Sequence, residues 1–181
     1  MRRLVEAPPA FSPARRGALT VAVDPGFRHG HKCAVLDRNK VVAHFAVDAP
    51  AYGDGQERWR AAAADLDSRL AAFGGAVATF AVGDGANSRG ARRLVAGSAA
   101  VRTGGAAYVV VRECGASAYS ASPLGEAELP EVPLARRSAV SLGRRACDPT
   151  AGNGGTLPRT RETQAFRDRT KASTLGEPEE G

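Results

Sequence analysis

The spacing of apolar residues changes several times between residues 19 and 147. Short apolar runs at 19–23, 33–36 and 41–47 follow one another closely, separated by an Asp-Pro-Gly turn and by the polar segment 37–40. Runs of this length that are rich in β-branched residues predict strands. Three such strands in immediate succession predict an antiparallel meander.

A helical period follows this meander. From Gln56 to Phe73 apolar residues recur three or four positions apart, and Gly74-Gly75 closes the segment as C-terminal glycines do. Further strands are predicted at 77–82 and 107–111. Further helices are predicted after Asn87 or Ser88, at 116–120 with a stop before Pro123, and at 134–147 with a stop at Asp148-Pro149.

The element order β-β-β-α-β-α-β-α-α predicts an α/β fold with a five-stranded mixed sheet flanked by helices. Strands four and five each follow a helix, so they are expected to lie parallel to a central first strand. One domain is predicted at 19–149. The Pro- and Arg-rich segment 1–18 is expected to be a disordered basic arm, and 150–181, which has no apolar periodicity, a disordered tail.

Composition excludes membrane-spanning and secreted proteins and weakens the case for a nucleic-acid-binding protein. No apolar run approaches the roughly 20 residues of a membrane span, and the N-terminus has no secretory h-region. The net charge of +6 favours nucleic-acid binding, but residues 19–149 carry only half of it. The three cysteines form no CxxC pair, which indicates a reducing, intracellular compartment, cytoplasm or nucleus. The Arg-rich start leaves an organelle address open.

Acidic residues stand at the ends of the strands predicted to be parallel. Asp24 ends the first strand, Asp84 follows the fourth, and Glu113 follows the fifth. Neighbouring strands lie roughly 5 Å apart, so these carboxylates are expected to converge. Such a cluster repels itself unless a cation holds it, and Mg²⁺ or Mn²⁺ would suit its oxygens. The alternative is that Asp24 and Asp84 are ordinary turn formers beside Pro and Gly.

The last predicted helix adds a fourth acid. Arg137, Ser141, Arg144 and Asp148 share one face. On this prediction Asp148 points at the strand ends, and the arginines lie beside it, where a phosphate backbone could run. The alternative is a solvated Arg-rich face that ends in an ordinary helix-terminating Asp.

Other candidate functional residues have simpler structural interpretations. His29, His31 and Lys32 follow Asp24 in what is more simply a solvated turn, and Arg89, Arg92 and Arg93 form a basic patch that is more simply a solvated face. Gly83-Asp84-Gly85 is too short to cradle phosphate, and no GxGxxG motif occurs.

Four stretches together resemble the YqgF-like, RNase H-like domain of Tex-type transcription accessory proteins. They are VAVDPGFRHGHKCAVLDRNKVV (21–42), VGDGANSR (82–89), VVVRECGASAYSASP (109–123) and RRSAVSLGRRACDP (136–149). The resemblance implies an RNase H-like fold with metal-site acids at Asp24, Glu113 and Asp148. The family usually has Asn at the position of Asp84. The HGHK and SASP details resemble the eukaryotic relatives, which pair this domain with an RNA-binding OB-fold domain.

Two functions follow from this resemblance. The first is a non-catalytic scaffold that binds RNA or DNA weakly and works with transcription or ribosome-associated proteins, with candidate nucleic-acid contacts at Lys32, Arg89, Arg137, Arg144 and Arg145. The alternative is a Mg²⁺- or Mn²⁺-dependent nuclease of the RNase H or Holliday-junction-resolvase kind. Its catalytic and metal-binding residues would be Asp24, Glu113 and Asp148, with Asp84 as a further metal ligand.

Overall fold

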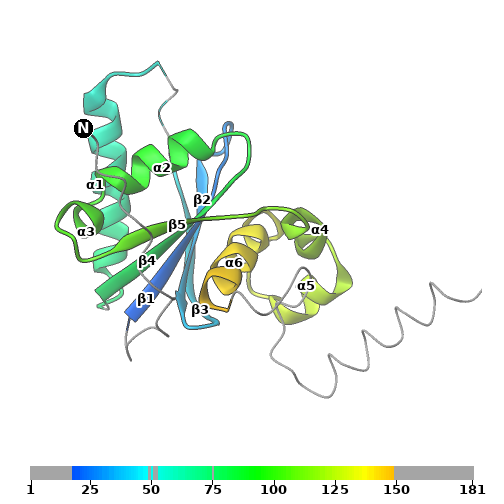
Figure 1. The fold of residues 1–181 in the computed structure, drawn as a ribbon. Helices are drawn as coiled ribbons and strands as arrows, with labels where there is room; N and C mark the ends of the chain where they lie inside the picture. Colours follow the sequence, from blue (N-terminus) through cyan, green and yellow to red (C-terminus); the bar gives the residue numbers. More distant parts are fainter. Residues whose placement is uncertain (1–17, 49, 51–52, 75, 149–181) are drawn as a thin grey trace, which may run out of the picture.

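Five strands and six helices make up the part of the chain that the computed structural model describes, residues 18–48, 50, 53–74 and 76–148 (Figure 1). The strands are β1 (Ala18–Asp24), β2 (His31–Asp37), β3 (Lys40–Val47), β4 (Ala76–Gly83) and β5 (Ala107–Val111). The helices are α1 (Gln56–Ala71), α2 (Ser88–Gly97), α3 (Ala99–Arg102), α4 (Ala116–Ser120), α5 (Pro123–Glu128) and α6 (Leu134–Cys147). Except for Ala18, which opens β1, the predicted arm and tail lie outside the described residues.

The strands form one mixed sheet in the order β3-β2-β1-β4-β5. β1 pairs antiparallel with β2, and β2 with β3, which confirms the predicted meander. β1 pairs parallel with β4, and β4 with β5. The carboxyl ends of β1, β4 and β5 therefore lie at one edge of the sheet, here called the strand rim. In open α/β sheets this edge is where ligands bind.

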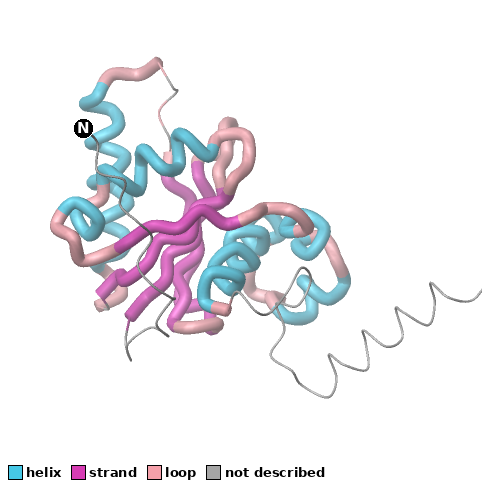
Figure 2. The backbone as a smooth tube through the Cα atoms, viewed as in Figure 1, coloured by secondary structure: helices cyan, strands magenta, loops and turns pink. Residues whose placement is uncertain are grey.

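Helices cover both faces of the sheet. Figures 1 and 2 show α1, α2 and α3 on one side and α4, α5 and α6 on the other. Alternate residues of β1 enter two cores: Val21 and Val23 pack in the core of α1 and α2, while Ala22 packs in the core of α6. Because β1 is central, it is buried on both faces and reads as a continuous apolar run.

Small residues let α6 lie close to the sheet. The α6 face of the three central strands carries Ala22, Ala34 and Ala81, all fully buried. Gly143 lies above them, and a Cβ placed there would overlap Leu36 and stand 3.1 Å from the Cβ of Ala22. The absence of a side chain at Gly143 therefore sets how closely the helix packs.

Two short helices, α3 and α5, depart from the predicted element order. Pro123 was expected to stop a helix, but it occupies the first turn of α5, where its missing N–H costs nothing. Ser122 caps this helix by accepting a hydrogen bond from the Gly125 N–H at 3.0 Å. The start of α3 is bound by Asp67 of α1, which accepts from the Ala99 N–H at 2.8 Å. A cap supplied by a distant helix has no local sequence signal.

Gly143→Val is expected to lower the free energy of unfolding by about 1–3 kcal/mol, because its methyl groups would be forced against Leu36 and Ala22 in a packed core. Chemical denaturation measures this change. The matched control is Ala135→Val on the exposed side of the same helix, which is expected to change stability by less than about 0.5 kcal/mol. Equal effects of the two substitutions would contradict the close approach of α6.

Candidate functional site at the ends of the parallel strands

Asp24, the last residue of β1, is buried at the strand rim. Its side chain faces α6, where the Ser138 hydroxyl donates a hydrogen bond to Oδ2. Lys32 stands opposite Asp24 on β2, and its Nζ lies 3.8 Å from the same oxygen. Asp24 therefore does more than form a turn, since its carboxylate is held between a hydroxyl and an ammonium group.

Asp84 and Glu113 join the ends of β4 and β5. The Asp84 N–H donates to the Val111 carbonyl oxygen at 3.0 Å, and the Glu113 N–H donates to Asp84 Oδ1 at 2.8 Å. The Glu113 carboxylate lies against the Gly83-Asp84-Gly85 turn, where a Cβ on either glycine would overlap its oxygens. A side chain at either position would displace the Glu113 carboxylate from its place against the turn. The turn, too short for phosphate, thus holds a carboxylate.

The rim is electrostatically crowded around Glu113. Burial raises the pKa of Glu113, and the negative charges of Asp24 and Asp84 raise it further, while the Gly85 N–H and the Lys32 ammonium oppose this rise. Oε1 of Glu113 is buried and makes no hydrogen bond with any described residue. Three of the predicted acids therefore do influence one another at the strand rim.

Asp148 is not part of this cluster, which corrects the predicted convergence of four acids. It follows Cys147, whose sulfur lies 3.5 Å from Thr20 Oγ1 near the start of β1. The α6 residue beside Asp24 is instead Ser138, ten positions earlier and about 15 Å away along the helix. The chain leaves β5 at the rim, so α6 begins there and runs back along the sheet. This connectivity was the signal that pointed to the first half of the helix.

The side chains of the rim acids are not arranged as a metal-binding group. Among the described residues, no set of three or more His, Cys, Asp or Glu is placed to hold a metal ion. Oδ2 of Asp24 faces Ser138 and Lys32, and Oδ1 of Asp84 accepts from a backbone N–H. The predicted Mg²⁺ or Mn²⁺ ligand set therefore does not fit this arrangement, and no metal-dependent step follows from it.

The α6 arginines predicted to contact nucleic acid make bonds within the domain. Arg144 Nη1 donates to Glu128 Oε2 at 2.9 Å and to the Tyr119 hydroxyl at 3.1 Å, and both side chains of the ion pair are largely buried. Arg137 and Arg145 donate to backbone carbonyl groups of the segments that precede α6 and follow β5. These three side chains fasten α6 to its neighbours.

His31 is fully buried, so the prediction of a solvated turn is wrong at this position. Its Nδ1 accepts a hydrogen bond from the Gly26 N–H at 3.3 Å, and its Nε2 has no partner among the described residues. Burial lowers the pKa of His31 to about 4, and the charge of Lys32 acts in the same direction. The ring is therefore neutral near pH 7 and supports the base of the β1–β2 loop from inside.

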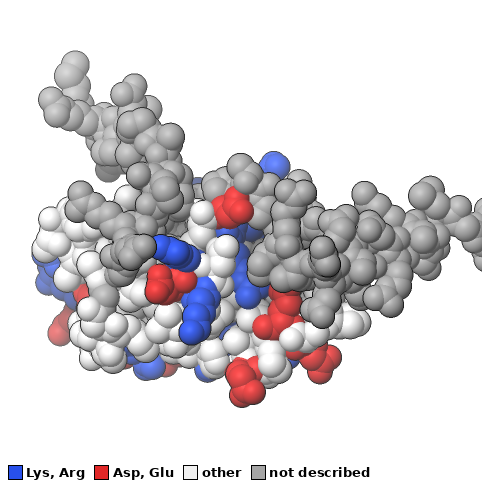
Figure 3. All heavy atoms as spheres, turned by 90° about the horizontal axis from the view of Figure 1, so that it is seen from below, with Lys and Arg blue, Asp and Glu red and all other residues white. Residues whose placement is uncertain are grey.

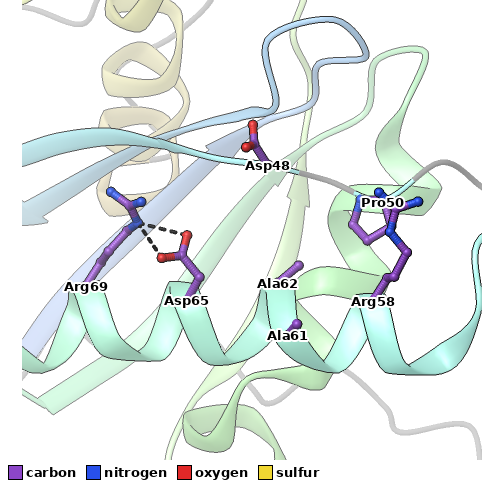
Figure 4. Close-up of a pocket in the computed structure, with 7 residues that line it drawn as sticks. All are labelled: Asp48, Pro50, Arg58, Ala61, Ala62, Asp65 and Arg69. Carbon is purple, nitrogen blue, oxygen red and sulfur yellow. Dashed lines mark hydrogen bonds and ion pairs between the residues drawn. The ribbon is translucent and has the colours of Figure 1, made fainter.

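A hollow lies between α1 and the end of β3, away from these acids. Its volume is about 430 Å³, and Figure 4 shows Arg69 and Asp65 paired along the α1 side of it. Their bond is 2.9 Å long, and Arg58 likewise bonds to Asp54 at 2.9 Å. None of the predicted site residues lines this hollow, so the strand rim and its adjoining loop remain the candidate site.

The five-stranded order and the flanking helices define an α/β domain of the YqgF/RNase H-like class. A family model described as "Tex protein YqgF-like domain" matches residues 18–147. The chain therefore belongs to the Tex-type YqgF-like family. Among the described residues, no helix is both long and apolar enough to cross a membrane.

Curated relatives agree with this membership. "Protein tex" of Bordetella pertussis is 39% identical over 141 residues, which are 76% of this chain and 17% of that protein. "Uncharacterized protein YdcI" of Bacillus subtilis is 33% identical, over 83% of this chain and 20% of that protein. Human "S1 RNA-binding domain-containing protein 1" is 31% identical, over 75% of this chain and 13% of that protein. The chain thus spans a fifth or less of these relatives.

Stability is expected to fall as the pH is lowered from about 6.5 to 4, because the unfolded chain protonates His31 while the folded domain keeps it neutral. The stabilisation is complete above pH 6.5 and is lost toward the folded pKa, for a loss of roughly 3 kcal/mol at pH 4. Denaturant titrations at a series of pH values measure this slope.

The control is His31→Gln, which keeps an acceptor for Gly26 and does not titrate. The free energy of unfolding of this variant should change less over the same pH range. Only the carboxylates, which both proteins contain, still titrate there. Parallel losses in both proteins would show that a buried neutral His31 does not cause the acid sensitivity.

Proposed function

We propose that this domain is a non-catalytic nucleic-acid-binding module of a Tex-type protein. Membership of the family supports the proposal, as do the names of two relatives, "Transcriptional accessory protein Tex" of Neisseria gonorrhoeae and the human "S1 RNA-binding domain-containing protein 1". Both names belong to proteins much longer than the matched segment. The binding surface must therefore be argued from this domain.

The exposed tip of the β1–β2 loop carries the proposal. Phe27 is 72% exposed, and its neighbours Arg28 and His29 are exposed as well. An aromatic ring on which a base can stack, beside an arginine that attracts phosphate, is a combination that single-stranded nucleic acids bind. The loop adjoins the strand rim, the edge at which α/β sheets take their ligands.

The loop is held firmly at its base, so its exposed tip is presented by a defined backbone. Gly30 has a φ of 69° and lies so close to the Val47 carbonyl that a side chain would collide with it. Asn87, just before α2, donates to the Gly26 carbonyl oxygen at 2.9 Å. This bond keeps the loop against the start of α2, where Arg89 is exposed.

We define the loop surface as Phe27, Arg28, His29 and Arg89. Of the five contacts predicted from sequence, Arg89 belongs to it, whereas Arg137, Arg144 and Arg145 are engaged within the domain. Where described residues are visible on the face seen from below in Figure 3, basic and acidic side chains lie interspersed. Four contacts give weak, salt-sensitive binding.

Phe27→Ala is expected to weaken binding of short single strands by about 5- to 150-fold, because a stacked base contributes about 1–3 kcal/mol. Fluorescence anisotropy of labelled RNA and DNA strands at low salt measures this loss. Arg28→Ala and Arg89→Ala should each weaken binding less and reduce its salt dependence.

Two exposed residues outside the loop surface serve as matched controls, Tyr108→Ala on β5 for the aromatic ring and Arg102→Ala on α3 for the charge. Neither is expected to change affinity. Loss of binding in the controls but not in Phe27→Ala would exclude the loop surface as the binding site.

The non-catalytic part of the proposal has its own test. With Mn²⁺ present, the wild-type domain is expected to leave single strands, RNA–DNA hybrids and branched DNA intact. Gel electrophoresis of labelled substrates follows the reaction. Cleavage that disappears in Asp24→Asn would contradict the proposal and establish the nuclease alternative.

A further inference from the structure

Lys32 points into the strand rim and not away from it. Its Nζ is 3.8 Å from Asp24 Oδ2, its side chain is only 26% exposed, and its charge also acts on Glu113. The nitrogen lies 3.7 Å from the place where a Cβ on Gly26 would stand, so it extends across the start of the loop. A lysine ammonium is normally strongly hydrated, and this one is partly withdrawn from water beside two acids.

Ser138 completes the surroundings of Asp24. It is a buried residue of α6, and its hydroxyl donates to the same Oδ2 that faces Lys32. The helix therefore places a neutral donor where a metal site would need a further carboxylate. Divalent ions such as Mg²⁺ require several oxygen ligands around them.

The positive charge of Lys32 offsets the repulsion among the rim acids. Asp24, Asp84 and Glu113 would repel one another without a cation among them. The Lys32 ammonium supplies a positive charge from the neighbouring strand, at a position fixed by the β1–β2 register. A divalent ion at the same place would be repelled by that ammonium.

We propose that the Lys32 ammonium is the resident cation of the strand-rim acids, standing where a divalent metal ion would otherwise sit. Removing this charge is expected to let a divalent metal ion bind weakly at the rim, and a carboxylate in place of Ser138 is expected to strengthen that binding. Lys32 is then an internal counter-ion and not a phosphate contact. The Mn²⁺ measurements that test this assignment do not require the loop surface to bind nucleic acid.

The experiment titrates the full chain, freed of metal with a chelator, with Mn²⁺ and follows free Mn²⁺ by electron paramagnetic resonance. Four proteins are compared: wild type, Lys32→Met, Ser138→Asp and the double variant. Methionine keeps the length of the lysine stem without its charge. The double variant is expected to bind Mn²⁺ at least about tenfold more tightly than wild type. Adding Asp24→Asn to the double variant should abolish this gain.

Two results would overturn the inference. One is Asp24-dependent Mn²⁺ binding by the wild type with an affinity close to that of the double variant. The other is a double variant that is folded by circular dichroism but binds no more tightly than wild type.

A second measurement covers the case in which the double variant does not fold. Thermal melts of Lys32→Met alone should show a rise in Tm on adding Mn²⁺ that the wild type lacks, because a ligand that binds only the folded state stabilises it. Absence of this difference also overturns the inference. So does a loss of nucleic-acid affinity in Lys32→Met as large as that in Phe27→Ala, because Lys32 would then be a phosphate contact.

Discussion

Three like charges meet at the ends of three neighbouring strands, and the rim is arranged to keep them there. Parallel pairing of β1 with β4 and of β4 with β5 leaves Asp24, Asp84 and Glu113 no freedom to separate. Each carboxylate accepts at least one donor: a serine hydroxyl for Asp24 and backbone N–H groups for the other two. Hydrogen bonds to the charged form and one nearby ammonium offset the repulsion and the loss of water.

Close packing against the sheet fixes the position of α6. Alanines on the sheet and Gly143 on the helix bring the two backbones close, which carries Ser138 to Asp24 at one end of the helix and Cys147 to Thr20 at the other. Arginines along the helix then bind the segments that surround it. Arg137, Arg144 and Arg145, which the sequence suggested as a basic surface, therefore bind within the domain, whereas Phe27, Arg28 and Arg89 beside the rim are exposed.

Family membership and the local geometry answer different questions. The match over residues 18–147 establishes the YqgF-like domain, but a fold hosts many functions, and the activity has to be argued from the site. Here Asp24, Asp84 and Glu113 make hydrogen bonds or ion pairs within the domain, although Oε1 of Glu113 has no partner among the described residues, and the exposed Phe27 is on the adjoining loop. That division separates a rim that maintains the structure from a surface that can meet a partner.

The strands and the longer helices were predictable because their signals are local: β-branched runs, a 3.6-residue period and glycine stops. Connectivity likewise determined that Asp24, Asp84 and Glu113 would share an edge. The exit of the chain from β5 at the rim already indicated the direction of α6, whereas the burial of His31 and the internal bonds of Arg137, Arg144 and Arg145 were decided only by tertiary packing. The physical reason is that the exposure of a side chain and its hydrogen-bond partners depend on which distant segments pack against it. Residue type and spacing do not encode those tertiary contacts.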